Sequence, residues 1–124
     1  MLKDVDVMAT IAVKDLDAAK KFYGEKLGLD STSDQKGVLT FRSGNSKITV
    51  YVSKFAGTNK ATSATWVVPD AEAVVTSLQS KGVKFEHYDD LPGLTRKGDL
   101  HVAGSFKGAW LKDPDGNILH ILSI

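Results

Sequence analysis

The chain has 124 residues, of which 42% are hydrophobic and 25% charged, so it is long and apolar enough for one globular domain with a buried core. Its 16 basic and 15 acidic side chains nearly cancel, which gives no chain-wide field to attract nucleic acid or a membrane surface. The absence of cysteine excludes disulfides, thiolate nucleophiles and thiolate metal sites. No apolar run has the length of a signal peptide or membrane span. These features predict a cytoplasmic protein whose partners are neither nucleic acid nor membrane.

The first half reads as strand, helix and hairpin. Residues 5–13 are β-branched and apolar, which predicts a strand buried on both faces. Asp15 or Asp17 then caps a helix that ends at Gly28. Its packed face is predicted to consist of Leu16, Ala19, Phe22, Tyr23 and Leu27. Further strands are expected near residues 31–33, at 38–43 and at 47–53, the last two joined by a Gly-Asn turn.

The second half repeats this order. A strand at 64–68 precedes a helix that starts at Asp70 and stops at Gly82. The buried stripe of this helix is predicted to consist of Ala73, Val74, Val75 and Leu78. Strands are expected at 83–88, 108–112 and 118–123, the last after an Asp-Pro-Asp-Gly-Asn turn. The glycine-rich segment 89–107 is predicted to be irregular and to act as a lid, or else to dock on the body of the protein.

The two helix starts, Asp15 and Asp70, lie 55 residues apart at matching points of the repeat. A chain of this length holds only two such copies, which favours a pseudo-twofold pair over a solenoid. We therefore predict a single domain over residues 1–124, built from modules of about 1–55 and 62–124.

Three segments resemble the vicinal oxygen chelate superfamily, which holds glyoxalase I, extradiol dioxygenases and bleomycin-resistance proteins. They are VKDLDAAKKFYGEKLGL at 13–29, VPDAEAVVTSLQSKGV at 68–83 and WLKDPDGNILHIL at 110–122. The resemblance implies an α+β fold of two βαβββ modules that form an open cavity. It also implies a homodimer.

The resemblance places four metal-ligand positions in this chain, at Met8, Thr49, Ser63 and His120. A thioether and two hydroxyls are poor ligands for the hard divalent ions that such sites hold. We therefore expect neither a metal nor another cofactor, and the metal-dependent reactions of the superfamily are disfavoured. A different centre made of Glu86, His101 and His120 is the alternative, although no spacing motif supports it.

Strand alternation and the implied cavity together predict a ligand-binding surface with an apolar character and several hydroxyls. Its predicted residues are Met8, Thr10, Thr49, Tyr51, Ser63, Thr65, His101 and His120. The alternative is that these side chains only fill the interior, with His120 a core histidine and His101 a solvated loop residue. Trp66 is predicted to lie on the opposite face, and the face of Trp110 stays open.

Two functions remain. The first is a metal-independent protein that binds a small molecule, as bleomycin-resistance proteins sequester a drug. The second is an enzyme of the same fold, with His120 as catalytic base in proton transfer of the lyase or isomerase type, with or without a divalent metal. A single histidine without a partner carboxylate favours the binding protein.

Overall fold

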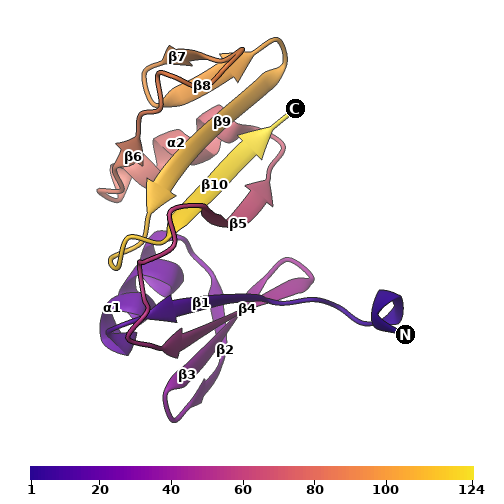
Figure 1. Ribbon diagram of the computed structural model, residues 1–124, viewed down its shortest axis with the longest axis vertical. Helices are drawn as coiled ribbons and strands as arrows, with labels where there is room; N and C mark the ends of the chain where they lie inside the picture. Colours follow the sequence, from indigo (N-terminus) through magenta and orange to yellow (C-terminus); the bar gives the residue numbers. More distant parts are fainter. The chain divides into compact units, whose positions relative to one another are not determined.

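The computed structural model, which describes residues 1–124, has two units in which the first strand is followed by a helix and pairs with the last strand of the unit. One unit comprises residues 1–60 and 113–117, and the other comprises residues 61–112 and 118–124. In each unit the first strand pairs in parallel with the last, and the remaining strands follow in antiparallel order. The fold is therefore α+β, with one βαβββ motif in each unit (Figure 1).

The first unit has a four-stranded sheet in the order β1-β4-β3-β2. Its elements are a 3-10 turn at Leu2–Asp4, β1 at Ala9–Val13, α1 at Leu16–Ala19, a π-helical segment at Lys20–Lys26, β2 at Asp30–Gln35, β3 at Val38–Ser43 and β4 at Ser46–Val52. The expected helix and hairpin are confirmed. The strand predicted at 5–13 begins only at Ala9, because residues 5–8 are exposed and make no ladder (Figure 1).

The Asp15 side chain begins the first helix, since its Oδ1 accepts hydrogen bonds from the backbone N–H groups of Asp17 and Ala18. Gly28 follows the helix with a φ of 74°, as a left-handed cap requires. The sheet buries only one face, so the prediction that the first strand is buried on both faces is wrong. The core of this unit contains Ile11, Val13, Ala19, Phe22, Tyr23, Leu39, Phe41, Ile48 and Val50.

The turn at residues 113–117 belongs to this first unit and is fixed by a buried carboxylate. Asp113 Oδ1 accepts from the backbone N–H groups of Asp115 and Asn117, at 3.0 and 2.9 Å. Asp113 Oδ2 accepts from the Tyr23 hydroxyl at 2.7 Å, and Asn117 Nδ2 donates to the Ala12 carbonyl at 2.8 Å. The turn predicted from the sequence is thus confirmed, and it is bound to the first helix and strand.

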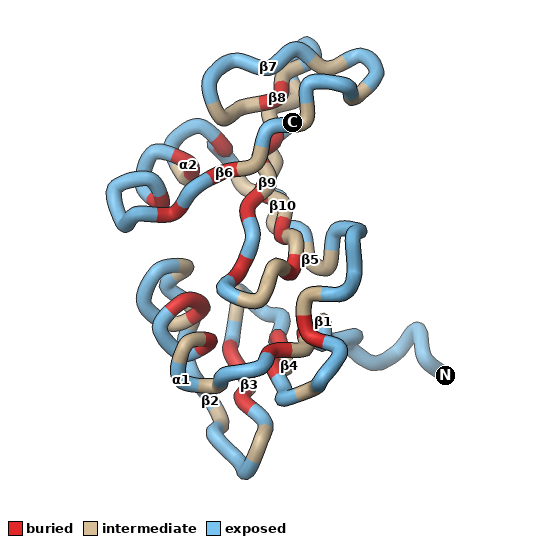
Figure 2. The backbone as a smooth tube through the Cα atoms, turned by 60° about the vertical axis from the view of Figure 1, so that its left-hand side comes forward, coloured by how far each residue is buried: buried red, intermediate tan, exposed pale blue.

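The second unit has a sheet in the order β5-β10-β9-β8-β7, with β6 paired to the far end of β9. Its elements are β5 at Thr62–Val67, α2 at Ala71–Ser80, β6 at Phe85–Glu86, β7 at Thr95–Lys97, β8 at Leu100–Ala103, β9 at Phe106–Lys112 and β10 at Ile118–Ser123. Buried and less buried positions alternate along β10 (Figure 2). Helix α2 packs on the face of the buried positions through Ala71, Val75 and Leu78.

Three predictions for this unit are corrected. The segment 89–107 is not irregular, because β7 and β8 form a hairpin within it. The strand expected at 83–88 shrinks to Phe85 and Glu86, which pair with Leu111 and Trp110 of β9. Ala73 is exposed, because α2 turns Ala71 and Val75 toward the sheet instead. No helix in the chain is long and apolar enough to cross a membrane.

Candidate functional site

The most unusual feature of the second unit is a stack of two rings on the face of the sheet opposite α2. His120 on β10 is the cross-strand partner of Trp110 on β9, and cross-strand partners project to the same side. Their rings are parallel within 2°, with centroids 4.1 Å apart. Trp110 therefore lies on the same face of the sheet as His120, which answers the question that the sequence left open.

His101 is the second imidazole on this face. It lies on β8 opposite Gly108 of β9, and its side chain is completely buried. Its ring stands perpendicular to that of Trp110, at 88° and 4.9 Å between centroids. The alternative that His101 is a solvated loop residue is wrong, because the segment around it forms the β7–β8 hairpin.

One hydrogen bond defines the tautomer of His101. The backbone N–H of Tyr88 donates to His101 Nε2 at 3.0 Å. A backbone N–H can only donate, so Nε2 presents its lone pair and Nδ1 carries the ring proton. Nδ1 is buried and has no hydrogen-bond partner. His101 therefore offers an unused donor, and its Nδ1 cannot bind a metal ion while this hydrogen bond exists.

His120 offers the second unused nitrogen. Its Nε2 is buried and has no partner. Burial lowers the pKa of His120, and the charge of His101 in its protonated form would lower it further. The ring is therefore neutral at pH 7.

Gly108 provides the space in which His120 Nε2 and Phe106 sit. A Cβ atom at Gly108 would lie 2.9 Å from His120 Nε2 and 2.8 Å from Phe106 Cζ. Tyr88 completes the group, with its ring at 79° to Trp110 and 5.5 Å between centroids. We call these five side chains the aromatic cluster: Tyr88, His101, Phe106, Trp110 and His120.

Carboxylates near the cluster are engaged elsewhere. Glu86 lies 3.4 Å from Lys112 Nζ, and Asp99 accepts from His87 Nε2 at 2.7 Å. The hydrogen bond from His87 holds the pKa of Asp99 below its usual range. In the second unit no three His, Asp or Glu side chains converge as a metal site requires. The alternative centre of Glu86, His101 and His120 is therefore not formed.

Thr65 and Ser63 are the other predicted site residues of this unit. Thr65 on β5 is the cross-strand partner of His120, so the prediction that they share a face is confirmed. Ser63 lies where the pairing between β5 and β10 shifts by one residue. Trp66 pairs with Ile121 and is on the opposite face, as expected.

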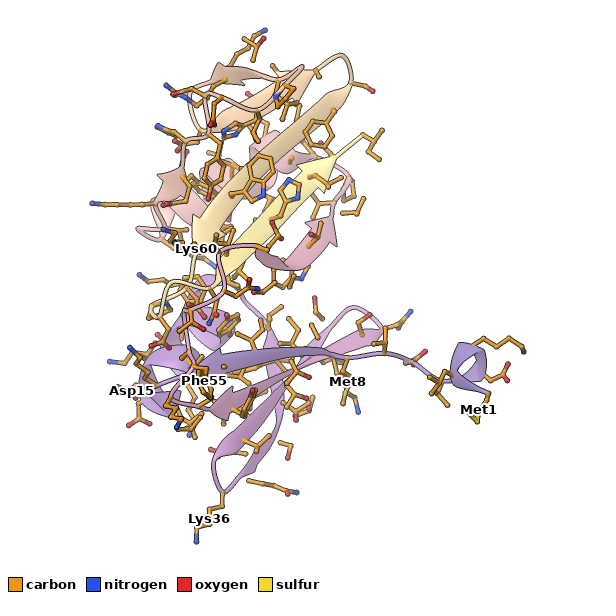
Figure 3. All side chains as sticks on the ribbon, in the orientation of Figure 1. Met1, Met8, Asp15, Lys36, Phe55 and Lys60 are labelled. Carbon is orange, nitrogen blue, oxygen red and sulfur yellow. The ribbon has the colours of Figure 1, made fainter.

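The remaining predicted residues belong to the first unit. Thr10 and Thr49 are cross-strand partners on β1 and β4, and Tyr51 follows Thr49 on the same face. Met8 precedes β1 and is 47% exposed (Figure 3). Thr10 and Tyr51 are exposed on this face of the first sheet, and the strand register places Arg42 and Lys47 on the same face.

Sequence reasoning missed Tyr88, Phe106 and Gly108 as parts of the site. A signal for two of them was present, because Phe106, Gly108 and Trp110 alternate along one strand face. The strand was predicted to begin at Gly108, which left Phe106 in the lid. Tyr88 carries no periodic signal, since it follows a two-residue strand and joins the cluster through its backbone N–H and its ring contact with Trp110.

Comparisons with known proteins agree on the fold. The model of the Glyoxalase/Bleomycin resistance protein/Dioxygenase superfamily matches residues 6–121. A glyoxalase/bleomycin resistance protein/dioxygenase from Alicyclobacillus acidocaldarius is similar in structure, with a TM-score of 0.72, 19% identity and coverage of 99% of this chain and 94% of that chain. A comparison with curated proteins finds no match.

Two further structures carry more specific descriptions. A bleomycin resistance determinant encoded on the transposon Tn5 has a TM-score of 0.72 at 18% identity, with 96% of this chain and 97% of that chain covered. A lactoylglutathione lyase from Agrobacterium tumefaciens has a TM-score of 0.70 at 16% identity, with coverage of 96% and 92%. At such identities the similarity shows the fold alone. One of the two structures is described as a resistance determinant and the other as a lyase.

Proposed function

Because the chain belongs to the Glyoxalase/Bleomycin resistance protein/Dioxygenase superfamily, we propose that it binds a small organic molecule at the aromatic cluster without a metal ion. The observation that carries the proposal is the pair of buried ring nitrogens without partners, His101 Nδ1 and His120 Nε2. A buried polar atom without a hydrogen bond costs about 1–3 kcal/mol. A ligand that hydrogen-bonds to one of these atoms removes that cost on binding.

The chemistry of the cluster selects a neutral, planar molecule with a hydroxyl group. None of the five side chains carries a full charge at pH 7 when both imidazoles are neutral, and their rings offer apolar, stacking surfaces. A hydroxyl both donates and accepts, so it satisfies His120 Nε2 in either tautomer. Phe106 is half-buried, with its ring centroid 6.4 Å from that of His120, so its ring borders the space into which a ligand for this nitrogen would enter.

The side chains at the metal-ligand positions support binding without a metal ion. The superfamily's ligand positions hold Met8, Thr49, Ser63 and His120, a set with no carboxylate and one imidazole. The second imidazole of the cluster, His101, has its free nitrogen protonated. We therefore assign no step to a metal ion.

A second candidate is an enzyme in which His120 accepts a proton from the bound molecule. The lowered pKa of His120 favours this role, because the ring is in its basic form at neutral pH. No carboxylate orients the ring, which leaves binding as the better-supported function. Turnover of a bound molecule by the native protein, abolished in His120→Gln, would establish the enzyme.

The test of binding uses protein freed of metal by dialysis against a chelator. We expect 2-naphthol to bind about three- to tenfold more tightly than naphthalene in calorimetric titration, since only the first has a hydroxyl that can hydrogen-bond to His120 Nε2 in either tautomer. His120→Phe keeps an aromatic ring on Trp110 and should abolish the difference. His87→Phe, which changes an exposed histidine outside the cluster, should keep it. Equal affinity of the two probes for the native protein would contradict the proposal.

A further inference from the structure

The second unit has a pocket on the face of its sheet opposite the aromatic cluster. Helix α2 packs on β9 and β10 on this face (Figure 1), and its Gln79 Nε2 donates to Asp99 in the β7–β8 turn at 2.6 Å. A pocket of about 480 Å³ is lined by Glu72 of α2 together with residues of the β7–β8 hairpin. The lining residues are Glu72, Gly93, Thr95, Lys97, Leu100, Val102, Ala103, Gly104 and Lys107.

Strand register explains why apolar and basic groups meet there. Val102 of β8 lies between Thr95 of β7 and Lys107 of β9. Leu100 of β8 lies opposite Lys97 of β7 on the same face. The half-buried Leu100 and Val102 thus form an apolar floor, with an ammonium group at each side.

The charges of the pocket do not cancel. Lys107 Nζ lies 3.3 Å from Glu72 Oε2, which engages one ammonium group with one carboxylate. Lys97 has no ion-pair partner. The pocket therefore carries one uncompensated positive charge beside an apolar floor.

We propose that this pocket binds a small organic monoanion, a carboxylate with a short apolar tail. The carboxylate meets Lys97 and the Thr95 hydroxyl, and the tail lies on Leu100 and Val102. A single net charge suits a monoanion better than a phosphate dianion, and neither lysine provides the forked geometry with which arginine holds phosphate. The volume lies within the usual range for small-molecule sites. This site is separate from the aromatic cluster and does not depend on the function proposed for it.

The probe is hexanoate, titrated into isotopically labelled protein and followed through the backbone amides of Gly93, Thr95 and Gly104. We expect saturable shifts at these amides with hexanoate, smaller shifts with 1-hexanol and none with inorganic phosphate. The amides around His120 should not move. Equal responses to hexanoate and 1-hexanol would refute the role of charge, and equal responses to hexanoate and phosphate would refute the role of the apolar floor.

Three variants sharpen the test. Lys97→Gln should weaken hexanoate binding about two- to fivefold, the range for an exposed ionic contact. Glu72→Gln should strengthen it by a similar factor, because it frees Lys107 and removes a negative charge. Lys84→Gln, an exposed lysine outside the pocket, is the matched control and should change nothing. A gain of affinity cannot result from misfolding, so unchanged or weaker binding in Glu72→Gln would overturn the proposal.

Discussion

The hydrogen bond between Tyr23 and Asp113 provides the sharpest stability prediction. Tyr23 is fully buried in the first unit, and its hydroxyl donates to Asp113 Oδ2 at 2.7 Å. Tyr23→Phe removes only this hydroxyl and keeps the ring. The centroid of this ring lies 5.1 Å from that of Phe22 and 6.0 Å from that of Phe41. The substitution therefore isolates the hydrogen bond from the packing of the ring.

The magnitude follows from the burial and charge of the acceptor. Asp113 is 5% exposed, so water cannot replace the lost donor easily. A hydrogen bond to a charged group is worth about 1.5–3 kcal/mol, and three other N–H groups still donate to this carboxylate. We therefore expect Tyr23→Phe to lower the free energy of unfolding by about 1.5–3 kcal/mol.

Urea denaturation measures this change, with the slope of the transition unchanged between variant and native protein. Tyr51→Phe is the matched control, because Tyr51 is 38% exposed and should change stability by less than about 0.5 kcal/mol. A loss below about 0.5 kcal/mol in Tyr23→Phe would show that the buried hydrogen bond does not stabilise the unit.

Three further predictions address pH, backbone and assembly. His120 should titrate below the ordinary histidine range by NMR, so its contribution to stability should grow as pH rises from its folded pKa to about 6.5; an ordinary or raised pKa would contradict the burial of its ring. Gly57→Ala should lower the free energy of unfolding by at least about 2 kcal/mol, because φ is 73° and the new Cβ would lie 1.8 Å from the Asp115 carbonyl oxygen. Gly37→Ala is the control, since φ is 78° there but no atom lies near the new Cβ, and it should lower the free energy of unfolding by only about 1 kcal/mol. The chain should form a homodimer by light scattering, because β1 and β5 are edge strands of their sheets and Val5 and Val7 are 64% and 89% exposed; a monomer at micromolar concentration would refute this.

Much of the fold was predictable because local signals agreed with it. Asp15 and Asp70 both cap helices through their side chains, and the strand at Val38–Ser43 has the predicted bounds. Strand alternation, together with the cavity that the family resemblance implied, placed His120 and Thr65 on one face, and the register confirms this placement. In these elements, caps and alternation are sufficient to specify the backbone.

The rest depended on contacts between residues distant in sequence. The β7–β8 hairpin is short and carries glycines, so only its pairing with β9 marks it as part of the sheet. His101 was expected in a loop because its burial comes from Trp110 and from the backbone of Tyr88. The tautomer that removes His101 as a metal ligand follows from that backbone contact alone, which no sequence pattern encodes.

The ring nitrogens of the aromatic cluster provide the most direct test of metal-free binding. In metal-free protein, 2-naphthol should shift the ¹⁵N resonance of His120 Nε2 saturably and leave that of His87 unchanged. Adding zinc should not increase the affinity. Binding that appears only with zinc, or that leaves the His120 resonance unmoved, would contradict the account.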